Sequence, residues 1–203
     1  MIVYNILDYI FSAPSNVTVL RVLNERVVGI SGRKTARLAK ISLRSAQNVL
    51  LNLQALKIVN KQVGGREHLF TLNRKNYISK KIISYLFDIE RDFNESLFLL
   101  IKKKLGKFTV SIIVFGSVAR REEDYSSDLD LCIVFSSNKR KIETILNELR
   151  DQLYSNYGIN IAPFFITSSK FKSDNKKNNP PVNKILKDGV VISGKSINRL
   201  LNG

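Results

Sequence analysis

Two short apolar runs, each bounded by turn residues, constrain the fold of this chain most strongly. The first run, residues 112–115, leads directly into Gly116 and Ser117, and the second, residues 131–135, follows an Asp-x-Asp motif. Short apolar runs bounded in this way are typical of buried strands. The pattern predicts a strand ending at Gly116, a short helix starting at Ser117, and a second strand that carries both aspartates.

The Asp-x-Asp motif consists of Asp128 and Asp130. Because strand side chains alternate between faces, both carboxylates are expected to point the same way. Two adjacent carboxylates repel unless a cation lies between them, and oxygen ligands suit Mg²⁺ (or Mn²⁺), which also accepts substrate phosphates. Gly116 permits a close backbone approach, and Ser117 adds a hydroxyl at a helix N-terminus, which attracts anions. These features predict a site for a nucleoside triphosphate.

The pattern of Gly116-Ser117, a short spacer and Asp128-x-Asp130 resembles the motif of the DNA polymerase β-like nucleotidyltransferase superfamily. The resemblance implies a domain with a small mixed sheet and flanking helices. It implies that Asp128 and Asp130 are catalytic and hold the metal, and that Gly116, Ser117 and Arg120 bind the nucleotide. The alternative interpretation is a strand end followed by a solvated acidic loop.

The sequence departs from the family pattern on the next strand. Catalytic relatives generally carry a third carboxylate there, whereas this chain offers Asn160, and no Asp or Glu lies between Gly158 and Lys172. An amide cannot act as a general base at neutral pH. Three alternatives stay open: catalysis with two carboxylates, a third acid such as Asp124 or Asp174 reaching in, or nucleotide binding without turnover.

The charge of the chain indicates a polyanionic partner. The 203 residues carry a formal net charge of +16 and a pI near 10. Residues 1–75 hold 12 Lys and Arg against 3 Asp and Glu, so this smaller part is the more basic per residue. Nucleic acid is the simplest such partner. A general solubility adaptation is the alternative explanation.

A helix, a tight turn and a second helix are predicted within the basic part. Ser31 is expected to cap a helix over residues 32–40, and Ser42 to cap a helix that continues to about residue 56. The core-facing residues expected on the second helix are Leu43, Ala46, Leu50 and Leu53.

A hairpin is predicted next, with strands at residues 58–63 and 68–72 joined by Gly64-Gly65. This order of elements resembles the winged helix-turn-helix family, which implies DNA binding. The alternative is a basic surface that contacts protein. The residues expected to contact DNA are Arg33, Arg37, Arg44, Ser45, Asn48 and, at the hairpin tip, Arg66, with Lys61 as a further phosphate contact.

The fold class expected is α+β with three segments. Residues 1–75 form the winged helix-turn-helix, residues 76–106 a long helical connector, and residues 107–203 the nucleotidyltransferase-like domain.

Within the last segment a basic loop is expected over residues 170–179. Cys132, the one cysteine, is expected in a buried strand as core filler, which fits a reducing cytoplasm. No run reaches the length of a membrane span.

The leading hypothesis is a nucleotidyltransferase that transfers a nucleoside monophosphate from a triphosphate such as ATP to a protein or small-molecule acceptor, with DNA bound by the winged helix. The alternative hypothesis is a non-enzymatic DNA-binding transcription regulator whose nucleotidyltransferase fold only binds nucleotide, which Asn160 favours. Winged-helix regulators commonly dimerise, so a homodimer is also among the expectations.

Overall fold

A computed structural model of the chain describes residues 2–65 and 67–202. The chain divides into two units, Met1–Asp92 and Phe93–Gly203, and the division falls within the helix α5 (Ser84–Leu105). No helix among the described residues is both long enough and apolar enough to cross a membrane.

The helical connector expected at residues 76–106 is not a separate segment. Phe87 is buried in the core of the first unit, whereas Leu97 and Ile101 are buried in the core of the second. The two ends of this amphipathic stretch are therefore each buried by the elements nearest to them in sequence. For this reason the division lies after Asp92 and not near residue 75.

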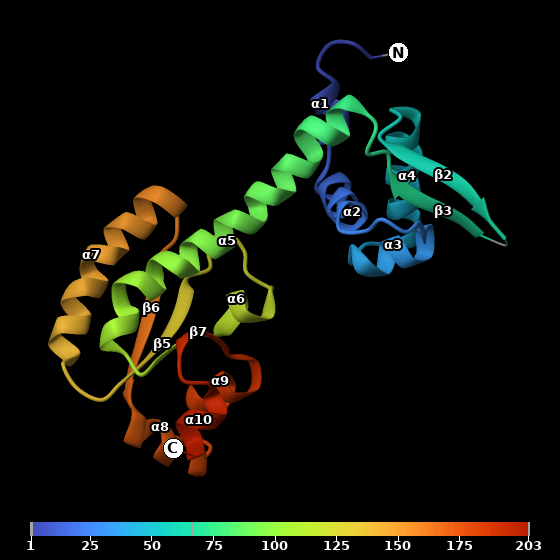
Figure 1. Ribbon diagram of the computed structural model, residues 1–203. Coiled ribbons are helices and arrows are strands. Elements are labelled where there is room, and N and C mark those ends of the chain that lie inside the picture. Colours follow the sequence, from blue (N-terminus) through green and yellow to red (C-terminus); the bar gives the residue numbers. More distant parts are fainter. Residues whose placement is uncertain (1, 66, 203) are drawn as a thin grey trace. The chain divides into compact units, whose positions relative to one another are not determined.

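The first unit packs helices against a small antiparallel sheet (Figure 1). The strand order is β1-β3-β2, so β3 is central. The short strand β1, which the sequence pattern did not predict, pairs Ile30 with Phe70, and both side chains are buried. The elements are α1 (Ile6–Ile10), α2 (Pro14–Asn24), β1 (Ile30–Ser31), α3 (Gly32–Leu38), α4 (Leu43–Ala55), β2 (Val59–Gly64), β3 (Glu67–Leu72) and a π-helical turn (Ser79–Ile83).

The two predicted helix caps of the first unit are confirmed. The hydroxyl of Ser31 accepts the N–H of Lys34 at 3.4 Å, and that of Ser42 accepts the N–H of Ser45 at 3.1 Å. Each cap satisfies a backbone donor that has no partner within the helix.

The predicted core face of α4 is wrong at its first residue. Leu43 is 41% exposed, and Val49 takes part in the core instead. Leu43 is the first residue of α4, and its side chain lines a cleft instead of packing in the core. Leu51 is likewise exposed, at 53%.

The second unit is built on a four-stranded mixed sheet with the order β6-β5-β4-β7. Strands β5 and β6 are parallel, and the other two pairs are antiparallel. The parallel pair is joined through α7, as a crossover connection requires. The elements are a 3₁₀ turn (Gly106–Phe108), β4 (Ser111–Val114), α6 (Gly116–Arg120), β5 (Leu129–Phe135), α7 (Lys139–Tyr157), β6 (Ile161–Thr167), α8 (Ser168–Lys176), α9 (Val182–Asp188), β7 (Val190–Gly194) and α10 (Ile197–Asn202).

Helices cover both faces of this sheet (Figure 1). Leu129, Leu131 and Ile133 of β5 pack in one core with α5 and α7, and Cys132 and Val134 pack in another with α8, α9 and α10. Because side chains alternate along β5, Asp130 belongs to the row of Cys132 and Val134. This row is buried along the strand and opens only at its first residue, which is Asp130.

The basic loop expected at residues 170–179 is largely the helix α8. The hydroxyl of Thr167 accepts the N–H of Lys170 at 3.2 Å and caps the helix, and Phe171 is fully buried. A capped start and one buried aromatic side chain stabilise a helix whose other residues are mostly polar.

We expect the thiol of Cys132 to be unreactive in the folded chain. Cys132 has no exposed surface, and burial raises its pKa to about 12. Because the thiolate is the nucleophile, modification at pH 8 should be negligible and should increase only as the pH approaches 12. Ellman's reagent at pH 8 measures this, with the chain unfolded in guanidinium as the reactive control. Equal rates for folded and unfolded chain would contradict the prediction.

Candidate active site

Strands β4 and β5 bring the Gly-Ser turn and the Asp-x-Asp motif together. Val114 pairs with Leu131 in the antiparallel register, and the N–H of Phe115 donates to the carbonyl oxygen of Asp130 at 3.1 Å. Antiparallel neighbours run in opposite directions, so the turn that follows β4 lies beside the start of β5. Two motifs that are separated by a dozen residues in sequence therefore occupy one corner of the sheet.

Gly116 is in direct contact with the carboxylate of Asp130. A Cβ atom added to Gly116 would overlap Oδ2 of Asp130, and the backbone of Gly116 has a φ of +73°. Both the left-handed backbone and the close approach require glycine at this position. The Asp130 carboxylate thus lies against the backbone at the start of α6.

The two aspartates differ in exposure and influence each other. Asp128 is exposed and lies one residue before β5, which begins at Leu129, and Asp130 is half-buried within the strand. Burial raises the pKa of Asp130, the charge of Asp128 raises it further, and Arg120 lowers it. The carboxylates are therefore close enough to repel, and a bound cation would relieve that repulsion.

Arg120 and Ser117 lie on α6, a helix of five residues. The helix starts at Gly116, one residue earlier than predicted. The Nε of Arg120 donates to Glu122 at 2.8 Å, which raises the pKa of this exposed guanidinium, and its Nη1 lies 3.9 Å from Oδ2 of Asp188. Asp188 at the end of α9 is a neighbour of the site that sequence reasoning missed, because only the β4–β7 pairing brings it there.

Asn160, which the sequence offers for the third carboxylate, lies one residue before the Leu129–Ile161 pair, at the register position that corresponds to Asp128. It precedes β6, its carbonyl oxygen accepts the N–H of Leu129 at 2.8 Å, and it lines a cleft on the side of α7 together with Tyr154. The register of the parallel pair places Ala162 opposite Asp130. The position next to Asp130 on β6 therefore carries a methyl group.

The two other acids considered from the sequence are engaged locally. Oδ1 of Asp124 accepts hydrogen bonds from the N–H and hydroxyl of Ser126, which lower the pKa of Asp124. Oδ1 of Asp174 accepts from Lys170 at 3.0 Å and from Asn179 at 3.1 Å, and Lys170 lowers the pKa of Asp174. Among the described residues, no group of three or more His, Cys, Asp and Glu side chains could hold a metal ion.

The donor set of the corner nevertheless fits a hard divalent cation. Asp128 and Asp130 offer only carboxylate oxygens, and Asp128 is open to solvent. Mg²⁺ is commonly held by one or two carboxylates, with water and substrate phosphates completing its six ligands. Two carboxylates therefore suffice to bind such an ion together with a nucleotide, although they do not enclose it.

Comparison with known proteins finds a similarity over the segment that contains this corner. Residues 96–190 match the family model of the nucleotidyltransferase domain. These residues are similar to nucleotidyltransferase domains. The matched range includes both aspartates, the Gly-Ser turn, Ala162 and Asp188.

Further similarities were found. The protein named "Putative protein adenylyltransferase MJ1305", from Methanocaldococcus jannaschii, is 37% identical over 68 residues, which are 32% of this chain and 46% of that protein. The match thus spans less than half of the relative's length. A crystal structure of a toxin–antitoxin with AMP-PNP aligns with a TM-score of 0.37 and 14% identity, covering 54% of this chain and 82% of that one. A crystal structure of human N-acetylserotonin methyltransferase in complex with SAM aligns with a TM-score of 0.32 and 12% identity. The alignment covers 49% of this chain and 31% of that one. Neither structural similarity is strong enough to inform function.

The residues expected to contact DNA lie outside residues 96–190, in the first unit. Arg33 and Arg37 are exposed on α3, and Arg44 and Asn48 are exposed on α4. Ser45 is half-buried, and its N–H is bonded to the capping Ser42. Arg66 lies outside the described residues.

We expect Gly116→Ala to weaken nucleotide binding, with Gly158→Ala as the matched control. Both glycines have positive φ, but nothing lies within 4 Å of a Cβ at Gly158. Both variants should lose about 1 kcal/mol of unfolding free energy from the left-handed backbone. Only Gly116→Ala displaces the Asp130 carboxylate, so its affinity for a non-hydrolysable ATP analogue with Mg²⁺, measured by calorimetry, should fall about tenfold or more. Unchanged affinity in Gly116→Ala would remove this corner as the nucleotide site.

Proposed function

We propose that the chain is a divalent-metal-dependent nucleotidyltransferase that transfers a nucleoside monophosphate from ATP or another triphosphate to a hydroxyl group of a protein or small molecule. The family match supports nucleotidyl transfer, and the name of the Methanocaldococcus jannaschii relative favours ATP and a protein acceptor. The observation that carries the proposal is the contact of the Asp130 carboxylate with Gly116. This contact places the residues proposed to hold the metal beside those proposed to hold the phosphates.

In this proposal Asp128 and Asp130 hold Mg²⁺ or Mn²⁺, which when bound neutralises charge on the triphosphate. The backbone at Gly116, the hydroxyl of Ser117 and the guanidinium of Arg120 hold the β- and γ-phosphates. The acceptor oxygen forms a bond to the α-phosphorus, the bond from that phosphorus to the bridging oxygen breaks, and pyrophosphate leaves. The acceptor proton passes to solvent, because β6 carries no carboxylate beside Asp130 to take it.

Label transfer from α-³²P-labelled triphosphates tests the catalytic role. Wild type should transfer label to an acceptor in cell extract or to itself, and Asp128→Ala should reduce the rate on the order of 100-fold or more. Glu148→Ala is the control, since Glu148 is an exposed acid of α7 in the same unit. Equal rates for wild type and Asp128→Ala would rule out the assigned site.

A second candidate function is nucleotide sensing without turnover, and Ala162 beside Asp130 is the observation that favours it. Saturable, Mg²⁺-dependent ATP binding without pyrophosphate release would distinguish a sensor from an enzyme. In both cases the same two aspartates bind the metal.

Ala162→Asp should supply the carboxylate that β6 lacks. Ala162 is half-buried and in register with Asp130, so the added carboxylate would lie beside it. We expect Mg²⁺ affinity in the presence of nucleotide to increase about tenfold, and pyrophosphate release to increase as well. The control is Asn147→Asp, which makes an Asp from an exposed residue of α7 in the same unit and should change neither quantity. An equal gain in Asn147→Asp, or no gain in Ala162→Asp, would contradict the register argument.

We further propose that the first unit is a winged helix-turn-helix that binds DNA. Its support is the capped helix pair α3–α4, the hairpin β2–β3, the exposed arginines on both helices and the excess of positive charge in residues 1–75. Such an excess favours contacts with phosphates. Residence in the cytoplasm and formation of a homodimer stay predictions from the sequence.

A further inference from the structure

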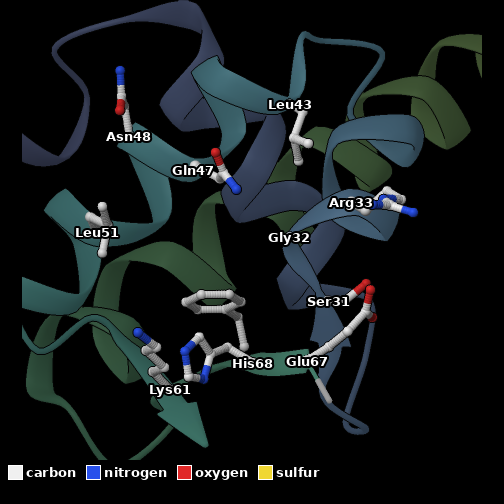
Figure 2. A pocket seen from close by; sticks show the side chains of 11 residues that line it. Ser31, Gly32, Arg33, Leu43, Gln47, Asn48, Leu51, Lys61, Glu67 and His68 are labelled. Atoms are coloured by element: carbon white, nitrogen blue, oxygen red, sulfur yellow. The ribbon is translucent and has the colours of Figure 1, made fainter. Parts of the chain in front are cut away.

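The first unit contains a cleft between α4 and the hairpin, with a volume of about 360 Å³. Leu43, Gln47 and Leu51 of α4 form one wall, and the strands β2 and β3 contribute Lys61 and His68 (Figure 2).

The α4 wall is a single row of side chains that the core does not use. Leu43, Gln47 and Leu51 are four residues apart, so they lie above one another on one helix face. The core is filled by a different face of α4, and the two leucines are 41% and 53% exposed. The amide of Gln47 has no hydrogen-bond partner among residues 2–65 and 67–202. The row is thus an apolar–amide–apolar surface available to a ligand.

The surroundings of the row favour a polyanion. Arg33 and Lys61 lie at the cleft without an ion-pair partner in the described part of the chain, and Glu67 is the one acid of its lining. Residues 1–75 carry nine more basic than acidic side chains. An apolar row bordered by free cations matches a groove of DNA, where apolar and polar base edges lie between phosphates.

We infer that Leu43 and Leu51 recognise thymine methyl groups, and that Gln47 between them recognises adenine, so that α4 selects A·T pairs in the major groove. This inference rests on the proposed DNA binding of the first unit. The thymine C5-methyl is the apolar group of the major groove, and a glutamine amide can bond both N6 and N7 of adenine.

The spacing of the row fits every second base pair. Residues four apart on a helix are separated by about 6 Å along its axis, and two base steps cover about 7 Å. Arg44, the side chain of α4 suited to guanine, does not line the cleft. The cleft side of α4 therefore carries groups that match adenine and thymine and none that matches guanine.

Replacement of thymine by deoxyuridine tests the inference, because it removes only the C5-methyl group. A duplex is first selected from a random library with the full chain. Each thymine of that duplex is then replaced in turn, and the affinity is measured at one fixed salt concentration. At one or two positions the affinity of wild type should fall about three- to fivefold, the contribution of one buried methyl group. Leu43→Ala and Leu51→Ala should each lose this discrimination at one position.

Leu99→Ala is the matched control, because Leu99 is a leucine of α5 that is 63% exposed and lies in the other unit. It should keep the full discrimination. If wild type binds a selected duplex but ignores every thymine replacement, or if the selected sequences are rich in G·C, the inference is overturned and DNA binding stands. If no duplex binds above the level of an unselected one, the proposed DNA-binding function fails and the inference fails with it.

Discussion

The contact between the backbone of Gly116 and the carboxylate of Asp130 is the constraint on which the site depends. It exists because β4 and β5 are antiparallel, with the N–H of Phe115 bonded to the carbonyl of Asp130. The buried apolar residues of both strands fix this register, since a shift of one residue would turn Asp130 toward the opposite core. The same burial that stabilises the sheet therefore positions the functional corner.

Burial and the neighbouring charge destabilise the ionised form of Asp130 in that corner. Asp130 is half-buried beside the charge of Asp128, and its raised pKa reports that the ionised carboxylate is disfavoured there. A group that reduces stability at neutral pH and points to an open corner is typical of a binding site and not of a structural one. Because β6 carries Ala162 beside Asp130, this position adds no further carboxylate to the two aspartates. The repulsion between carboxylates is smaller as a result, and a bound metal is less enclosed.

The two units present different chemistry to their partners. The second offers a compact acidic pair that would meet a triphosphate through a cation, and the first offers scattered cations on α3 and α4 that would meet phosphates directly. The row of Leu43, Gln47 and Leu51 adds an exposed surface without charge, so attraction to phosphates does not account for it. Attraction between cations and phosphates is independent of sequence, so selectivity for a base requires side chains that reach base edges, such as those of this row.

The sequence by itself determined the local features: the caps at Ser31 and Ser42, the strands around the Gly-Ser turn, and the motif spacing that the family match supports. These follow from residues close together in the chain. Only the tertiary structure decided that Ala162 and not Asn160 lies beside Asp130, and that α5 belongs to two cores. Strand register and helix burial depend on contacts between segments far apart in sequence, and the pattern of any one segment cannot specify them.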